Sequence, residues 1–281
     1  PPVCTVVIAG GATYTAQPSV TLSLSVTLLV SVPLRRFSHD GATWTAWESY
    51  ATMRTWTLPL PDGVRAVYAQ VQDTPGNLSV ACSDSIILDT TPPTGFVLVN
   101  GGALYTGVPT VTLTLGASDT NGVVQMRFSN NGTTWSSWQP YAVTAAWTLA
   151  SGDGLKTVYV EYRDVAGNIG GPFSDTIILD TTPPGGSIII DSGATYTRIP
   201  TVTLTLEATD AIPVTQMRFS HDGLTWGSWE PYADSRLWNL TPGDGVKTVY
   251  VQFRDTVGNT SAPLADSIIL DTTPPTCQVF I

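Results

Sequence analysis

Hydrophobic and polar residues alternate over short segments of this chain. The segment from Thr110 to Leu115, TVTLTL, alternates strictly, which places Val111, Leu113 and Leu115 on one face of a half-buried strand. Residues that favour turns separate such segments, and no segment has the 3.6-residue period of an amphipathic helix. The pattern predicts an all-β protein.

Between residues 92 and 182 this pattern predicts about seven strands, a number typical of an immunoglobulin-type sandwich. Asn130-Asn131-Gly132 marks a hairpin, and His-Asp-Gly at 39–41 and 221–223 marks the same hairpin elsewhere, because glycine supplies positive φ. The expected strands cover residues 96–99, 110–115, 123–129, 146–149, 155–162 and 174–179, with the hairpin partner of 123–129 near Trp135.

The whole pattern recurs without gaps. Asp-Thr-Thr-Pro-Pro begins at residues 89, 180 and 271, which are 91 apart, and the tryptophans keep the same register. Self-similarity at a fixed period makes each repeat one structural unit. We therefore expect three tandem immunoglobulin-like β-sandwich domains at 1–91, 92–182 and 183–273, with 274–281 as the first strand of a further repeat, because it aligns with 1–8.

The Thr-Thr-Pro-Pro segment predicts short, stiff connections. Proline cannot continue a strand ladder, and it restricts the preceding residue to extended conformations. We expect a semi-rigid, rod-like array, about 100 Å long for three units if strands of about eight residues rise about 3.3 Å per residue.

Composition excludes several partners. Charged residues make up 12% of the chain, the net charge is −10, and Lys156 and Lys247 are the only lysines. Such a surface repels nucleic acid and anionic membranes. The chain has no apolar run long enough to span a bilayer, and it opens on Pro1-Pro2 without a signal-peptide pattern. We expect no nucleic-acid partner and no membrane insertion in this segment.

A family resemblance rests on four segments of the second repeat and their counterparts in the other two. They resemble the immunoglobulin-like or fibronectin-type-III-like repeats of large bacterial and archaeal secreted and surface proteins. The resemblance implies that the chain is a spacer, a stalk, an adhesin segment or an appendage of an enzyme. The chain differs from eukaryotic immunoglobulin domains because it lacks a cysteine in each of two facing strands. The segments are FSNNGTTWSSW at 128–138, Trp147, GDGLKTVYVEYRDVAGN at 152–168 and SDTIILDTTPP at 174–184.

The sequence contains no recognisable catalytic site. His39 and His221 both lie beside the hairpin turn, and Asn130 takes their place in the second repeat, as expected of turn residues. No nucleophile elbow, metalloprotease, P-loop, dinucleotide or zinc motif is present. We expect no enzyme.

Paired tryptophans are the first candidate binding residues. Members of a pair are three residues apart, so in a regular strand one of them points outward. An outward ring could stack on a sugar, lie under a neighbouring guanidinium such as Arg127 or Arg218, or cover an interface; the core is the simplest alternative. The pairs are Trp44 and Trp47, Trp135 and Trp138, and Trp226 and Trp229.

Carboxylates are the second set of candidate binding residues, because the sandwich topology is expected to bring three of them together at each repeat boundary. Oxygen-rich side chains suit Ca²⁺, which would stiffen the joint and is the one cofactor we consider. The alternative is that the aspartates at 73, 164 and 255, each followed by Gly-Asn, cap a turn. Leu28 takes the place of one carboxylate in the first repeat. The groups are Asp89, Asp119 and Asp164, then Asp180, Asp210 and Asp255.

Cysteines follow a longer period. Cys4 and Cys277 are 273 residues apart, three times 91, and Cys82 precedes the last strand of the first repeat. The other repeats have Gly95 and Gly186 at the first position and Phe173 and Leu264 at the second. This co-occurrence favours a Cys4 to Cys82 disulfide and an oxidising, extracytoplasmic setting, with buried free thiols as the alternative.

The sequons at Asn77, Asn131, Asn239 and Asn259 would accept N-glycans in a host with the machinery. Together, the features predict a structural segment of an extracellular or cell-surface stalk or filament that provides reach, stiffness and self-association. Its partners would be copies of itself or further repeats of the same chain, joined covalently through 274–281 or by strand addition. The alternatives are an adhesin or carbohydrate-binding array that contacts cell-surface glycans, and a non-catalytic appendage of a secreted enzyme.

Overall fold

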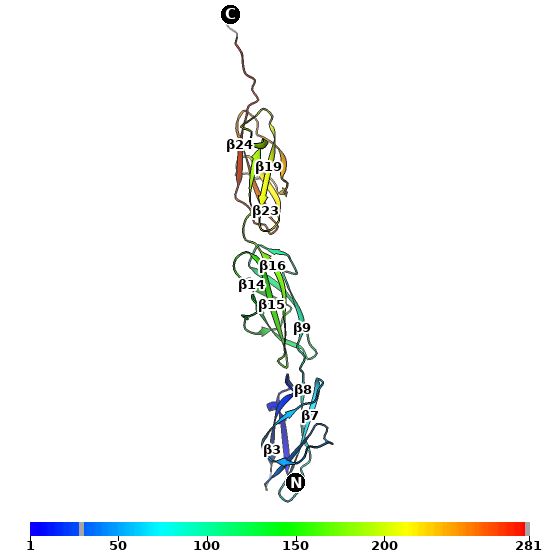
Figure 1. Ribbon diagram of the computed structural model, residues 1–281. Helices are drawn as coiled ribbons and strands as arrows, with labels where there is room; N and C mark the ends of the chain where they lie inside the picture. The colour runs from blue at the N-terminus through cyan, green and yellow to red at the C-terminus, as the bar shows by residue number, and fades with distance from the viewer. Residues whose placement is uncertain (28–30, 279–281) are drawn as a thin grey trace. The chain divides into compact units, whose positions relative to one another are not determined.

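A computed structural model describes residues 1–27 and 31–278 of the chain. The described part is all-β, as predicted, with the short 3₁₀ turns η1 (Ala9–Gly11) and η2 (Asp191–Gly193). The strands form three three-stranded and three five-stranded sheets, one of each kind per repeat. The fold is therefore a series of three two-sheet sandwiches (Figure 1).

The chain divides into two units, each of which is compact. The first contains Pro1–Leu98, Thr114–Ala145 and Val158–Asp175, and the second contains Val99–Leu113, Ala146–Thr157 and Thr176–Ile281. The second repeat contributes to both. The domain boundaries at 91, 182 and 273 stay predictions from the sequence period.

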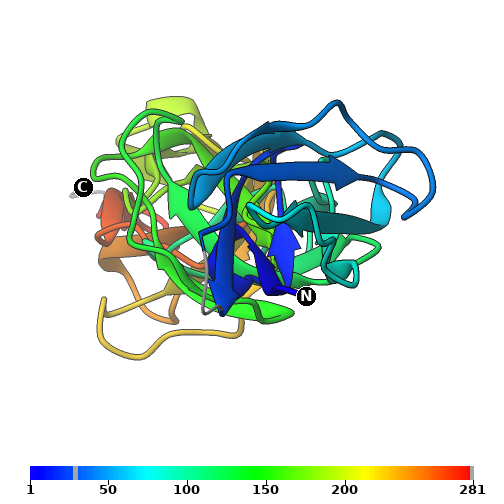
Figure 2. The ribbon, with the colours of Figure 1, turned by 90° about the horizontal axis from the view of Figure 1, so that it is seen from below.

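Within its described residues, the first repeat has eight strands, the seven expected ones and a further two-residue strand. Its three-stranded sheet pairs β1 (Val3–Ile8), β3 (Ser19–Thr27) and β6 (Met53–Thr57), all antiparallel. Its five-stranded sheet has the order β2 (Tyr14–Thr15), β8 (Cys82–Leu88), β7 (Gly63–Gln72), β4 (Leu34–Ser38) and β5 (Glu48–Ser49), with β2 parallel to β8. Figure 2 shows the dark-blue strands of this repeat beside the N-terminal label.

The other repeats reproduce this order. The second repeat comprises β9 (Thr94–Val99), β10 (Tyr105–Thr106), β11 (Thr110–Ser118), β12 (Val123–Ser129), β13 (Gln139–Pro140), β14 (Thr144–Thr148), β15 (Gly154–Asp164) and β16 (Ile169–Leu179). The third comprises β17 (Gly185–Ile190), β18 (Tyr196–Thr197), β19 (Thr201–Thr209), β20 (Val214–Ser220), β21 (Glu230–Pro231), β22 (Ser235–Asn239), β23 (Gly245–Asp255) and β24 (Leu264–Leu270). The six strands predicted by residue range exist and several are longer than expected, whereas the hairpin partner expected near Trp135 is the two-residue β13.

The alternating pattern fills the cores. Val111, Leu113 and Leu115 on β11 are 2%, 0% and 3% exposed, as the alternation predicts. The same positions on β3 and β19 are also buried. Burial of such side chains stabilises each sandwich by roughly 1.5–3 kcal/mol per residue.

The Asp-Gly turns have the expected backbone. Gly41 has φ 73°, and Asp40 Oδ1 accepts the amide hydrogens of Ala42 and Thr43 over 2.8 and 2.7 Å. Trp44 forms a β-bridge back to Ser38, but the returning strand β5 is only two residues long. The turn prediction is confirmed, and the chain between turn and β5 is irregular.

Candidate functional site

Each Asp-Thr-Thr-Pro-Pro linker is tied to the sandwich before it by one aspartate of a Gly-rich turn. Asp62 accepts hydrogen bonds from the amide and hydroxyl of Thr90, both over 2.9 Å, and from the hydroxyl of Thr91 over 2.8 Å. Asp153 and Asp244 bind the equivalent threonines at 181–182 and 272–273. The threonines are thus held in place rather than left as slack chain.

These bonds stabilise the charged carboxylates. Hydrogen bonds from the hydroxyls of Thr273 and Thr272 and from the Thr272 amide lower the pKa of Asp244 to about 2. The pKa of Asp153 is lowered in the same way by Thr182 and Thr181. The binding of the linker threonines by these aspartates was not predicted from the sequence. It could have been suspected from the constant spacing of 28 residues between Asp62 and Thr90 and between Asp153 and Thr181.

The following repeat holds each of the first two linkers with an asparagine. Asn168 Nδ2 donates to the backbone oxygen of Asp89 over 2.8 Å and to Asp164 Oδ2 over 2.8 Å. Asn259 makes the matching bonds to the Asp180 oxygen and to Asp255 Oδ2, over 2.9 and 2.7 Å. The turn-capping alternative therefore describes the Asp-x-x-Gly-Asn turns, whose asparagine also reaches the linker.

The structure brings together both predicted carboxylate groups. One carboxylate oxygen from each of Asp89, Asp119 and Asp164 lies within 4.8 Å of the other two. Asp89 and Asp164 are 2% and 1% exposed. Asn121 Nδ2 donates to Asp89 Oδ2 over 2.9 Å, so a neutral amide already partners this oxygen. Leu28, the first-repeat counterpart of Asp119, lies outside the described residues.

The second group has the same spacing and different partners. One oxygen from each of Asp180, Asp210 and Asp255 lies within 4.8 Å of the others, and Oδ2 of Asp180 and Oδ2 of Asp210 are buried without a hydrogen-bond partner. Burial raises the pKa of the Asp210 carboxyl, and the charges of Asp180 and Asp255 raise it further. Calcium binding at either group stays a prediction.

The predicted disulfide is present. Cys4 and Cys82 are bonded, with their Cα atoms 5.8 Å apart. Cys4 lies on β1 and Cys82 on β8, which belong to different sheets, so the bond joins the two layers. The hydrogen-bonded parallel neighbour of β8 within its sheet is β2, and β1 meets β8 across the sandwich.

In the second repeat an aromatic side chain occupies the space of the disulfide. A Cβ on Gly95, the counterpart of Cys4, would lie 2.6 Å from the ring of Tyr162. That ring is fully buried and lies 5.9 Å from the ring of Phe173, the counterpart of Cys82. The third repeat does the same with Gly186 and Phe253. Glycine at this position therefore fits the close approach of the ring together with a backbone oxygen of the neighbouring strand, that of Gly116 or Glu207.

Arginines cover the paired tryptophans. The guanidinium carbons of Arg127 and Arg163 lie 4.5 and 4.1 Å from the ring centroid of Trp138. Both distances are within the range of a cation–π contact, so two cations contact one ring. Trp229 is covered in the same way by Arg218 and Arg254, at 4.5 and 4.0 Å.

The first tryptophan of each pair lies near one guanidinium group. Arg127 lies 5.0 Å from the centroid of Trp135, and Trp44 and Trp226 have corresponding contacts with Arg36 and Arg218. In the first repeat Arg36 lies 4.5 Å from the centroid of Trp47. These rings therefore lie beside arginine guanidinium groups, which was one of the alternatives predicted from the sequence. Stacking of the rings on a ligand stays a prediction.

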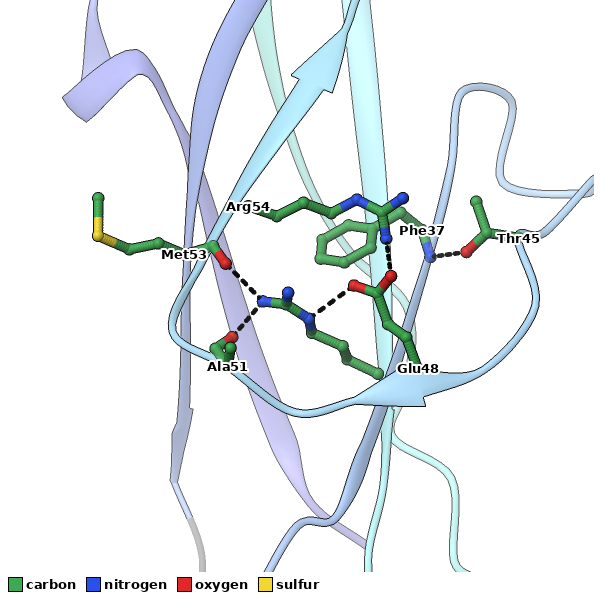
Figure 3. A network of polar contacts seen from close by, with 7 residues as sticks. Phe37, Thr45, Glu48, Ala51, Met53 and Arg54 are labelled. Carbon is green, nitrogen blue, oxygen red and sulfur yellow. Dashed lines mark hydrogen bonds and ion pairs between the residues drawn. The ribbon is translucent and has the colours of Figure 1, made fainter.

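The first repeat has a polar network around Glu48 (Figure 3), of which the third repeat keeps only the ion pair between Arg236 and Glu230, the counterparts of Arg54 and Glu48. Arg35 is 6% exposed, donates to Glu48 Oε1 over 2.8 Å and to the Met53 oxygen over 3.0 Å, and also donates to the Ala51 oxygen. Arg54 donates to the other oxygen of Glu48. The other repeats have Met126 and Met217 at the position of Arg35.

The remaining predicted residues lie in turns and strand ends. The ring of His39 packs 4.5 Å from that of Trp56, in keeping with a turn residue. Of the sequons, Asn77, Asn131 and Asn239 are exposed and Asn259 is half-buried. A glycan on Asn259 would use Nδ2, which already donates to Asp180 and Asp255. Glycosylation stays a prediction.

Residues 271–278 form no strand and are exposed, and Cys277 is unpaired within the described part. Residues 279–281, the end of the expected extra strand, lie outside the described residues. Within the ranges that the structure covers, no helix has the length and apolarity needed to cross a bilayer.

The strand order defines the chain as a tandem array of immunoglobulin-like, fibronectin-type-III-like sandwiches. No family model and no curated protein matches it. Among solved structures it is similar to the fibronectin(III)-like modules of Clostridium thermocellum CbhA, at 17% identity and TM-score 0.42, over 63% of this chain and 94% of that one.

Two further solved structures are similar to the chain over most of its length. One is a tetra-tandem repeat from the extending region of a large adhesion protein, at 20% identity and TM-score 0.34, over 97% of this chain and 75% of that one. The other is the FN1-FN3 segment of chicken CNTN1, at 12% identity and TM-score 0.38, over 96% of this chain and 98% of that one.

Proposed function

We propose that this chain is a non-catalytic structural segment of an extracellular stalk or filament, in which successive sandwiches provide reach and stiffness. The observation that carries the proposal is the double anchoring of each linker between repeats. Asp62 binds the linker threonines from the preceding sandwich, and Asn168 binds the Asp89 carbonyl from the following one. A linker fixed on both sides has little freedom to bend.

The disulfide supports an extracytoplasmic location. Structural disulfides persist in oxidising compartments, and Cys4 to Cys82 joins the two sheets of the first sandwich. The acidic, lysine-poor surface fits a role that involves neither nucleic acid nor anionic membrane.

Self-association is supported by apolar side chains exposed at one recurring position. Val64, Leu155 and Val246 are 67%, 68% and 68% exposed and occupy the same place in each repeat. A solvent-facing apolar residue kept at a 91-residue period would let copies of the array contact one another in register. The adhesin alternative has less support, because guanidinium groups lie over the rings that would stack on a sugar.

Small-angle X-ray scattering of the whole chain tests stiffness. We expect one well-defined maximum dimension on the order of 100 Å, from about 3.3 Å per residue along the strands. Replacing Asp153 and Asn259 with alanine should broaden the distribution of dimensions, whereas Asp84→Ala, outside the linkers, should not. A broad distribution in the unaltered chain would contradict the proposal.

Sedimentation equilibrium tests self-association. The chain should form concentration-dependent oligomers that weaken when Val64, Leu155 and Val246 are replaced together by serine. A chain that stays monomeric at high concentration would remove this part of the proposal and leave the stiffness argument standing.

A further inference from the structure

The two carboxylate groups differ in one neighbouring residue. Asn121 lies two positions after Asp119, and Ile212 lies two positions after Asp210, 91 residues further on. The Asn121 amide donates to Asp89 Oδ2 over 2.9 Å. Ile212 is 3% exposed and has no side-chain donor. The replacement removes the donor that the first group uses.

Without an amide donor at position 212, the second carboxylate group contains buried oxygens that have no hydrogen-bond partner. Oδ2 of Asp180 and Oδ2 of Asp210 are buried and accept no hydrogen bond. Asp180 is 1% exposed, and its other oxygen accepts only the Thr182 amide over 3.0 Å. Leaving a buried carboxylate oxygen unpaired is costly, and like charges in contact add repulsion.

Asp255 cannot relieve the repulsion. Its Oδ1 accepts the amide hydrogens of Val257, Gly258 and Asn259 over 2.9, 2.7 and 2.9 Å. A carboxylate accepts hydrogen bonds and donates none when ionised, so the group lacks a positive or donating member. The missing component is a cation with an affinity for oxygen.

We propose that Asp180, Asp210 and Asp255 bind one Ca²⁺ ion, whereas Asp89, Asp119 and Asp164 are closed by the Asn121 amide and bind none. Three acidic oxygens within 4.8 Å of one another suit a hard cation, and water can complete the six to eight ligands that Ca²⁺ takes. The two repeat boundaries therefore respond differently to calcium. This inference does not depend on the stalk proposal, because the ion could bind whatever the array does.

Isothermal titration of the calcium-stripped 281-residue chain with CaCl₂ at pH 7 tests the inference. We expect about one ion per chain, with a dissociation constant on the order of 10⁻⁴ M, as in extracellular calcium modules. Asp210→Asn should weaken binding at least tenfold, and the matched Asp119→Asn should leave it unchanged.

Exchanging the distinguishing residues gives a sharper test. Asn121→Ile should create a second site and raise the stoichiometry from one to two, whereas Ile212→Asn should remove the only site. Circular dichroism would verify that each variant is folded, and Ile212→Asn supplies the answer if Asp210→Asn does not fold.

Three results would overturn the inference. They are two ions bound to the unaltered chain, binding lost on Asp119→Asn and kept on Asp210→Asn, and no calcium binding at all. If the chain binds no calcium, Asp180 and Asp210 share a proton where we propose a metal ion.

Discussion

The phenolic hydroxyl of Tyr162 donates a hydrogen bond to the backbone oxygen of Phe96 over 2.6 Å. Through this bond a residue of the five-stranded sheet contacts the first strand of the opposite sheet, where the first repeat uses its disulfide. Burial raises the pKa of Tyr162, so the hydroxyl stays a donor across the physiological range. One polar contact and one ring take over the joining role of a covalent bond.

Tyr162→Phe should lower the stability of the second repeat by about 1 kcal/mol, because it removes one hydrogen bond between the two sheets. The third repeat has Phe253 here, so the ring itself is compatible with the fold. Hydrogen exchange followed by mass spectrometry resolves the repeats. Equal protection of β15 in both proteins would contradict the assigned role of the hydroxyl.

Replacing Cys4 and Cys82 together by alanine should destabilise the first repeat by up to about 4 kcal/mol in the loop-entropy description. The bonded residues are 78 apart in sequence, so the unfolded chain gains much freedom when the bond is removed. Guanidinium unfolding would show an earlier first transition. Cys277→Ser is the control and should change nothing, since that thiol is exposed and unpaired.

Arg163→Gln should cost the second repeat about 0.5–1 kcal/mol, because it removes one of the two cations over Trp138. The first repeat has Gln72 at this position, so the substitution is sterically acceptable. Trp138 fluorescence and thermal unfolding would report the change. A larger effect from Arg163→Gln than from Trp138→Ala would be incompatible with a stacking role.

Arg35→Met should be neutral or stabilising, since methionine fills this position in the other repeats and a buried ion pair gains little over apolar packing. Glu48→Ala should instead cost about 1–2 kcal/mol, because the buried Arg35 would keep its charge and lose its carboxylate partner. Denaturant titration of both variants measures the difference. A more harmful Arg35→Met would show that the network contributes net stability.

The Asp244 anchor should respond to acid. Its pKa is lowered to about 2 in the folded chain, below the value of about 3.9 for a free aspartate, so the bonds to Thr272 and Thr273 contribute fully above pH 4. This contribution is lost as the pH falls through about 2. Thermal unfolding of the chain and of Asp244→Asn should differ at neutral pH and converge in strong acid. A difference that persists below pH 2 would exclude the carboxylate as its source.

The hydrophobic pattern was sufficient to predict most of the fold. Alternation on β11 identifies the buried face because successive side chains of a strand point to opposite faces. The disulfide could be predicted because Cys4 and Cys82 occur together in one repeat, whereas both other repeats lack a cysteine at either position. A strand as short as β2 carries no periodic signal, and its pairing with β8 was missed.

The partners of individual polar groups could not be predicted. Asp62 looks like any turn residue, and its bonds to Thr90 and Thr91 depend on how the turn and the linker meet in three dimensions. The difference between Asn121 and Ile212 was visible in the sequence, but only the structure relates it to the Asp89 and Asp180 oxygens. Sequence periodicity locates elements, whereas hydrogen-bond partners require coordinates.

The parallel pairing of a two-residue strand with the last strand of each repeat has a mechanical consequence. In the third repeat Tyr196 and Thr197 pair with Ile269 and Leu270, and the two strands run in the same direction. If the two ends of this repeat are pulled apart, the paired strands are drawn in opposite directions along their length. All the hydrogen bonds between them then bear load at once, because shearing breaks them together and unzipping breaks them one by one. Each sandwich is therefore built to resist tension along the chain where its first and last segments meet.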